Sequence, residues 1–402
     1  MNTTAALRPP RRASVYVHFP WCLAKCPYCD FVSYAAPRES IDHEGYADAV
    51  IRELHARTQD RADTLTDRVI GSIFFGGGTP SLWSAHELGR VLAAIRASFR
   101  CAPDLEITVE CNPTSLDLEQ ARALGGVGVN RLSVGTQSLR PEQLRFLGRL
   151  HDPSGARAAI AAALSSGVPR VSTDLIFGLP EQTPEDARTQ AVALADLGLT
   201  HLSCYQLTIE PGTQFGELAK RGRLPRIDDG LVAESFLAID EALAARGLAH
   251  YEISNYARPG DEARHNLGYW HGEEYVGLGC AAFGFIRRSD VPGAATRYRN
   301  DVDPRRYVES TRRAQHVRER ETREPLEGEA LMRERIMLGL RLAEGLDVAD
   351  AARDLGVIAW TTERSDQAAR LVDKGRLVRD GDWIRLTPTA WLWADDTAAR
   401  LF

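Results

Sequence analysis

The stretch that decides the fold reads YVHFPWCLAKCPYCDF and spans residues 16–31. Its apolar start predicts a β-strand over residues 14–18. Three cysteines follow at once, Cys22, Cys26 and Cys29, with the spacing Cys-x3-Cys-x2-Cys. The loop that leaves the first strand is therefore expected to gather three thiols and to carry a binding site.

Close spacing of thiolates lets one loop wrap several irons of an iron–sulfur cube. Three ligands for four irons leave one iron open, and an open iron can chelate the amino and carboxylate groups of S-adenosylmethionine (SAM). Two other uses of such cysteines are a structural zinc site and a redox dithiol. Structural zinc wants a fourth Cys or His nearby, and a redox dithiol would not need Cys22. The spacing favours a [4Fe–4S] cluster over both.

Four further cysteines are scattered along the chain and have mostly apolar neighbours. They are Cys101, Cys111, Cys204 and Cys280. This distribution is a poor disulfide framework, so we expect buried core thiols in a reducing cytosol.

Short apolar runs alternate with helical patterns in the first part of the chain. Strands are predicted over residues 14–18, 71–75, 106–111, 131–135, 171–177 and 201–207, and helices over 85–99, 118–123, 153–166 and 184–196. Such alternation indicates βαβ units and a parallel sheet. Six units fall short of a full eight-fold barrel. The predicted fold class is therefore α/β, an incomplete (β/α) barrel.

We expect four parts along the chain. Residues 1–13 form a flexible N-terminus, 14–250 the barrel, 251–324 a barrel extension and linker, and 325–402 a C-terminal helical domain.

Within the extension, residues 251–256 are predicted as a final extended segment after a long helix over 228–250. The charged stretch 289–328 is predicted as a linker or peripheral helices.

The C-terminal domain is predicted to be winged-helix-like. Helical runs at 329–342, 348–354 and 361–374 precede short strands at 376–379 and 383–386, joined by a tight Asp380-Gly381 turn. A winged helix can bind DNA. Acidic residues among the arginines of this part favour a helical cap docked on the barrel.

The composition argues against nucleic-acid binding, membrane-spanning and secreted classes of protein. The 402 residues carry a net charge of −6, so no global basic field attracts nucleic acid. No apolar run approaches the length of a membrane span, and there is no secretory signal. A cytoplasmic protein is expected, with peripheral contact to a membrane left open.

Polar and glycine residues mark the ends of the next strands. Residues 76–80, GGGTP, follow the second predicted strand, and glycines let the backbone approach a ligand closely. Glu110, Gln137 and Asp174 lie at or near the third, fourth and fifth strands. At barrel strand ends such residues line a pocket, although each alone could be a satisfied polar core residue.

The cysteine spacing, the glycine loop and these polar residues together resemble the radical SAM superfamily. Nearly the whole chain resembles one branch, which contains the oxygen-independent coproporphyrinogen III oxidases and related haem chaperones. The resemblance implies that one electron from the cluster cleaves SAM, so an electron donor is also implied. It further implies a set of SAM contacts: Tyr16, Gly77, Gly78, Thr79, Glu110, Gln137, Arg149 and Asp174.

Two features separate the members of this branch. The oxidases carry a fourth cysteine two residues after the third, where this chain has Phe31. Residues 265–270, HNLGYW, resemble a haem-binding motif of the chaperones. By that resemblance haem would be bound by His265, Asn266, Tyr269 and Trp270.

The chemistry of this motif suits haem. An imidazole can ligate iron and two flat rings can face a porphyrin. A structural histidine beside two core aromatics is the alternative, and His271 is a competing ligand.

The resemblance therefore implies a chaperone that binds a [4Fe–4S] cluster, SAM and haem and transfers haem to recipient haemoproteins. The alternative is an oxidase that decarboxylates coproporphyrinogen III. A radical methylase is a third interpretation, without an additional cysteine motif to support it. Whether the protein is an enzyme stays open.

Overall fold

The structure is a computed structural model that describes residues 11–59, 65, 68–288, 291, 293–312 and 319–402. Most of the N-terminus predicted as flexible, residues 1–10, lies outside the described residues. The first strand, β1, already begins at Arg12.

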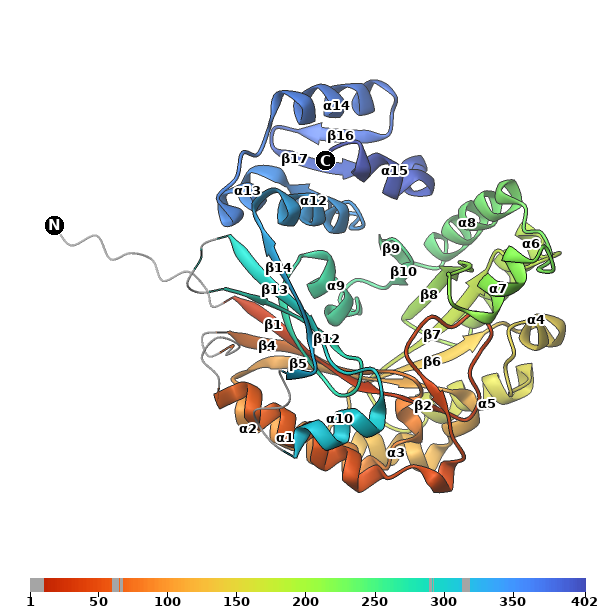
Figure 1. Cartoon of the computed structure of the whole chain (residues 1–402). Coiled ribbons are helices and arrows are strands. Elements are labelled where there is room, and N and C mark those ends of the chain that lie inside the picture. Colours follow the sequence, from red (N-terminus) through yellow and green to blue (C-terminus); the bar gives the residue numbers. More distant parts are fainter. Residues whose placement is uncertain (1–10, 60–64, 66–67, 289–290, 292, 313–318) are drawn as a thin grey trace.

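All six predicted barrel strands are present, and they pair in parallel in the order of the sequence. They are β1 (Arg12–Phe19), β4 (Val69–Gly77), β5 (Cys101–Cys111), β6 (Arg131–Gln137), β7 (Arg170–Phe177) and β8 (His201–Gln206). Most helices that follow these strands cover the outer face of the curved sheet (Figure 1), but the helix that begins at Gln214 lies beside the cysteine loop, where the Phe215 N–H donates to the Pro27 carbonyl. These helices are α1 (His43–Gln59), α2 (Ala85–Ser98), α3 (Leu118–Gly126), α4 (Pro141–Phe146), α5 (Pro153–Leu164), α6 (Pro184–Ala195), α7 (Gln214–Lys220) and α8 (Asp229–Ala244). The incomplete barrel predicted from the sequence is confirmed.

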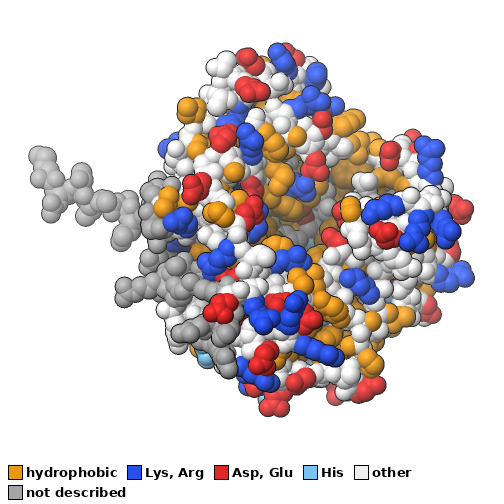
Figure 2. All heavy atoms as spheres, viewed as in Figure 1, with side chains coloured by type: hydrophobic (Ala, Val, Ile, Leu, Met, Phe, Trp, Pro, Cys, Tyr) orange, Lys and Arg blue, Asp and Glu red, His pale blue; other side chains and the backbone are white. Residues whose placement is uncertain are grey.

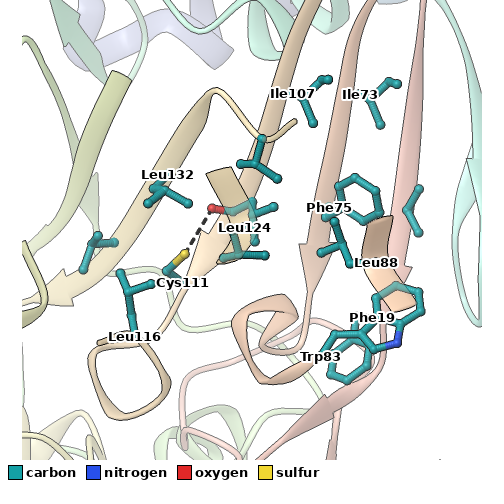
Figure 3. Close-up of a cluster of buried hydrophobic side chains, with 14 of the residues drawn as sticks. Phe19, Ile73, Phe75, Trp83, Leu88, Ile107, Cys111, Leu116, Leu124 and Leu132 are labelled. Carbon is teal, nitrogen blue, oxygen red and sulfur yellow. Dashed lines mark hydrogen bonds between the residues drawn. The ribbon is translucent and has the colours of Figure 1, made fainter. Parts of the chain in front are cut away.

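Successive side chains of each strand point alternately into the core beneath the helices and into the interior of the barrel. Figure 3 shows Ile73 and Phe75 of β4 pointing toward Leu88 and Trp83, in the core beneath the helices. Phe74, between them, faces the opposite side and lines a cavity. Successive side chains of a strand point to opposite faces, so the same strand builds the core and the site.

The sheet continues beyond the six barrel strands at both edges and reaches 12 strands. On the β1 side it adds β11 (Glu274–Leu278), parallel to β1, and then the antiparallel strands β12 (Phe283–Arg287), β13 (Ala294–Arg299) and β14 (Thr322–Glu327). On the β8 side it adds β10 (Asn255–Ala257) and β9 (Ala249–Glu252), both antiparallel. Along the chain, α9 (Arg264–Trp270) lies between β10 and β11, and α10 (Pro304–Thr311) follows β13.

Two expectations for this region were wrong. The single extended segment over 251–256 is instead a reversal between β9 and β10. The stretch 289–328 is not only linker and helices, because it contains β13 and β14. β14 is an edge strand with one buried residue, Leu326, so its sequence carries no apolar alternation to reveal it.

The C-terminal elements form a second core. They are α12 (Gly328–Gly339), β15 (Leu346–Asp347), α13 (Val348–Leu355), α14 (Thr362–Asp373), β16 (Leu377–Asp380), β17 (Trp383–Leu386) and α15 (Ala394–Ala399). The first three of these helices and a small sheet in the order β15-β17-β16 match the winged-helix-like prediction, and α15 follows them. Phe285 and Ala295 from the extended sheet belong to the same core, so the domain is docked on the barrel, where Figure 1 shows it in blue. Within the described chain, no helix combines the length and apolar character needed to cross a bilayer.

Candidate functional site

The three predicted ligand cysteines lie on one loop at the carboxyl end of β1. Cys22 belongs to a short pair of strands, β2 (Trp21–Cys22) and β3 (Tyr34–Ala35), which closes the loop at its base. Inside it, the Cys29 N–H donates to the Cys26 carbonyl at 3.1 Å. All three thiols are partly exposed and line one cavity of about 400 Å³, here called the cluster cavity. Three thiols on one short loop are a donor set that fits an iron–sulfur cube.

Two side chains from other strand ends contact these sulfurs. The Thr79 hydroxyl donates to Cys22 Sγ at 3.4 Å, and Arg149 Nη1 donates to Cys26 Sγ at 3.5 Å. Burial raises the pKa of the Cys22 and Cys29 thiols. No group of three or more His, Cys, Asp or Glu side chains in the described ranges is placed to hold a single metal ion.

The glycine loop after β4 packs directly against the cysteine loop. The Gly78 N–H donates to the Phe19 carbonyl at 2.7 Å, and the Thr79 N–H donates to the Trp21 carbonyl at 2.8 Å. A Cβ on Gly78 would lie 2.6 Å from the Trp21 oxygen. Gly77 has φ of +109°, and a Cβ there would overlap the His18 ring. The sequence predicts that these glycines let the backbone approach a ligand. In the structure they also let the glycine loop contact the cysteine loop.

Two partly buried carboxylates face the same cavity, Glu110 from β5 and Asp174 from β7. Glu110 accepts the Gly77 N–H at 3.1 Å, and Asp174 accepts the Ser133 hydroxyl at 3.3 Å. Burial, and then the charge of Asp174, raises the pKa of Glu110 to about 8. Burial likewise raises the pKa of Asp174 to about 6, against the pull of Arg149. A cationic ligand would offset the free-energy cost of ionising these two carboxyl groups. SAM carries two such cations, a sulfonium and an ammonium group.

SAM affinity should therefore depend on pH. Below pH 8 Glu110 holds a proton in the free protein, and a bound cation favours its carboxylate form. Binding then releases a proton, so affinity should rise with pH by up to about tenfold per unit for each proton released, and level off above pH 8. Calorimetry between pH 6 and 9 measures this. Dividing the SAM affinity of wild type by that of Glu110→Gln at each pH removes the contribution of SAM's own titration. If this ratio does not change with pH, Glu110 does not bind the cation.

The remaining predicted SAM residues also come together. Gln137 and Arg149 line the cluster cavity with Gly77, Gly78, Thr79, Glu110 and Asp174. The Arg149 Nη2 donates to the Gly135 carbonyl at 2.9 Å, while its buried Nε has no partner. Tyr16 is the exception. It lines the adjoining cavity, in contact with the set through Gly77 and Glu110, which line both.

This second cavity, of about 640 Å³, is largely aromatic and is here called the aromatic cavity. His265, Asn266 and Tyr269 of the predicted haem motif line it. His18, Phe74, Phe283, Arg297 and Arg299 line it too and were not predicted. The alternation of side chains along β1, β4, β12 and β13 could have indicated that these residues face the barrel interior. Only the order of the strands in the sheet brings them together.

His265 is almost fully buried, and both ring nitrogens have partners. Nδ1 lies 2.9 Å from the Ser72 hydroxyl, and Nε2 lies 3.1 Å from the Tyr269 hydroxyl. Its ring stacks on Phe74 at 4.8 Å, and burial lowers its pKa to about 3, so the imidazole is neutral. His271 is partly exposed and bonds to Glu344 at 2.7 Å.

The motif is split between two cavities. Trp270 lines a third cavity, of about 580 Å³, between α9 and the C-terminal domain. Tyr269 and Tyr275 line both this cavity and the aromatic one. Figure 2 shows the molecule hollowed between the C-terminal elements at the top and the helices at the right, with hydrophobic side chains inside the hollow.

Comparison with known proteins agrees with this architecture. Residues 16–191 match the family model described as the radical SAM superfamily, and residues 326–393 match the HemN C-terminal domain. A protein from Mycobacterium tuberculosis named heme chaperone HemW is 36% identical over 394 residues, which cover 98% of this chain and 95% of the relative. The chain belongs to the HemW family of radical SAM proteins.

Other relatives support the same placement. The heme chaperone HemW of Escherichia coli is 38% identical over 302 residues, covering 74% of this chain and 78% of the relative. A bovine relative, the mitochondrial radical S-adenosyl methionine domain-containing protein 1, is 36% identical, covering 84% of this chain and 74% of the relative. A radical SAM domain implies a [4Fe–4S] cluster and SAM, and the residues of the cluster cavity fit both.

The chain also shares its fold with a solved structure of an oxidase. Coproporphyrinogen III oxidase HemN from Escherichia coli superposes with a TM-score of 0.79, at 23% identity, over 98% of this chain and 91% of that one. At this identity the likeness shows the fold alone. The two proteins therefore share the barrel and the C-terminal domain.

Proposed function

We propose that this HemW-family protein is a haem chaperone that binds a [4Fe–4S] cluster, SAM and haem and passes haem to recipient haemoproteins. Its relatives in Mycobacterium tuberculosis and Escherichia coli, both named heme chaperone HemW, support the proposal. The observation that carries it is Phe31, which occupies the position of the fourth cysteine of the oxidases. Its phenyl ring is 58% exposed and lines both the cluster cavity and the aromatic cavity. A phenyl ring has no thiol to donate, and it offers a flat guest an apolar face.

At the cluster, we assign the thiolates of Cys22, Cys26 and Cys29 as ligands. The contacts that Thr79 and Arg149 already make to two of these sulfurs would stabilise the thiolate form. When bound, the cluster would supply an electron to SAM, and it would itself need an electron donor. We place this chemistry in the cytoplasm, where thiol ligands stay reduced.

For SAM, the cationic groups would be held by the carboxylates of Glu110 and Asp174. The backbone of Gly77, Gly78 and Thr79 brings this loop beside the cysteines. Gln137, Arg149 and Tyr16 complete the assigned set, the first two in the cluster cavity and the third beside it.

For haem, the proposal assigns His265 as the iron ligand, since its imidazole is neutral and lines the aromatic cavity. The Tyr269 hydroxyl would have to leave Nε2 before that nitrogen could bind iron. Asn266 lines the same cavity, and Trp270 offers a ring in the next one.

One experiment separates chaperone from oxidase. The cluster is reconstituted without oxygen, and the same sample is given haem, or coproporphyrinogen III with SAM and a reductant. We expect haem binding, transfer of that haem to an apo-haemoprotein, and no divinyl product, because Phe31 replaces the thiol. Steady multiple turnover of the porphyrinogen would overturn the proposal in favour of the oxidase.

A matched pair of variants locates the iron ligand within the same assay. His265→Ala should weaken haem binding or change the Soret band, because an axial imidazole is lost. His271→Ala, one residue beyond α9, should leave both unchanged. The reverse pattern would move the ligand to His271.

A further inference from the structure

The third cavity is lined by arginines as well as aromatic rings and is here called the arginine cavity. Tyr269, Trp270, Tyr275 and Phe285 provide its rings, from α9, β11 and β12. Arg11, Arg68, Arg287, Arg288 and Arg335 provide its cations. Three acids also line it, Glu273, Glu334 and Asp354. Flat apolar walls beside an excess of guanidinium groups suit a flat anion.

Most of these charges are already paired within the protein. Arg68 bonds to Glu274 at 2.5 Å, and Arg11 bonds to Asp354 at 2.5 Å. Arg287 pairs with the same Asp354. Glu334 pairs with Arg297 at 2.5 Å. Arg288 lies 3.9 Å from Glu327. These pairings leave one cation of the cavity without an ion partner among the described residues.

Arg335, on α12, is that cation. It forms no hydrogen bond or ion pair with any described residue, and its buried Nε has no partner. Burial and the charge of Arg287 lower its pKa, against the attraction of Asp354, Asp350 and Glu273. Arg335 is half-buried, and its enclosed Nε without a bonded partner is costly, so the free protein holds a site prepared for an anion.

Gly272, just after α9, makes room for this side chain. Its φ of +62° lies in the left-handed region, and a Cβ there would overlap the Arg335 guanidinium. The cation is therefore packed directly against the turn that follows the haem motif. Only one residue, His271, separates Gly272 from Trp270.

We propose that the arginine cavity binds the propionate carboxylates of the tetrapyrrole cargo, with Arg335 as their ion partner and Trp270 and Tyr269 against the ring. This inference rests on the proposed haem chaperone function and adds to it the group that recognises the cargo's acidic edge. The planar guanidinium binds a carboxylate through two parallel hydrogen bonds. Because Tyr269 and Tyr275 line both cavities, the acidic edge would lie next to the aromatic cavity that contains His265.

The test compares haem with haem dimethyl ester, whose carboxylates are blocked. Arg335→Gln should weaken haem binding on the order of tenfold or more, because a charge-assisted pair is lost. Binding of the ester should be the same for wild type and variant. The matched control is Arg353→Gln, which removes an exposed arginine of α13 that lies outside the cavity.

A stability measurement excludes a merely structural arginine. Removing a half-buried charge that has no bonded partner should leave the melting temperature of ligand-free Arg335→Gln equal to or above that of wild type. Equal haem affinity for Arg335→Gln and wild type would overturn this inference and leave the proposed function intact. Equal losses for haem and its ester would also overturn it. Failure of wild type to bind haem at all would overturn the proposed function, and this inference with it. Inorganic phosphate should compete with haem more strongly than with the ester, and equal competition with both would contradict the assignment of the propionates to this cavity.

Discussion

Replacing any one of Cys22, Cys26 and Cys29 by alanine is expected to abolish the broad visible absorbance of the reconstituted protein. Each thiolate would ligate one iron of the cube, and the cluster cavity offers no other cysteine in its place except Cys111. The Cys111 thiol is directed at the Val109 carbonyl, 3.4 Å away, as Figure 3 shows. Absorbance spectra and iron analysis measure the effect.

Cys204→Ala is the matched control, because Cys204 is a buried core thiol that does not line the cluster cavity. It should keep the absorbance of wild type. A variant lacking all three loop cysteines that still takes up about four irons per chain, the number in one cube, would contradict the ligand assignment.

The second large effect is expected at Gly78. A Cβ at this position would lie 2.6 Å from the Trp21 oxygen and 2.9 Å from the Phe19 oxygen, both of them backbone atoms. Neither can move without shifting the cysteine loop, so Gly78→Ala should impair the cluster and SAM binding together. Overpacking of this kind costs typically about 1–3 kcal/mol, occasionally more. Iron content, SAM calorimetry and thermal unfolding measure the three consequences.

Gly126→Ala is the control, since a Cβ on this helical glycine of α3 meets nothing within 4 Å. It should be neutral or slightly stabilising, because alanine is the better helix former. A Gly78→Ala protein with a normal cluster and weakened SAM binding would restore the original assignment of this glycine to the ligand.

The sequence by itself determined the barrel and the cysteine loop. Both depend on local patterns: the six strands on short apolar runs separated by helical segments, and the thiols on an eight-residue motif, Cys22 to Cys29. Local periodicity requires no knowledge of distant contacts. The scattered cysteines were also largely predicted, with Cys111, Cys204 and Cys280 buried and Cys101 partly exposed.

Only the tertiary structure decided how the functional residues are shared among cavities. His265 meets Ser72, 193 residues earlier, while Trp270, five residues later on the same short helix, faces a different cavity. The sequence motif could not show this division, because residues five apart on a helix point in different directions. Arg335 lies in a domain with its own core, and only docking brings it against Gly272. A site formed where two domains meet depends on contacts between distant segments, and those contacts leave no local pattern in the chain.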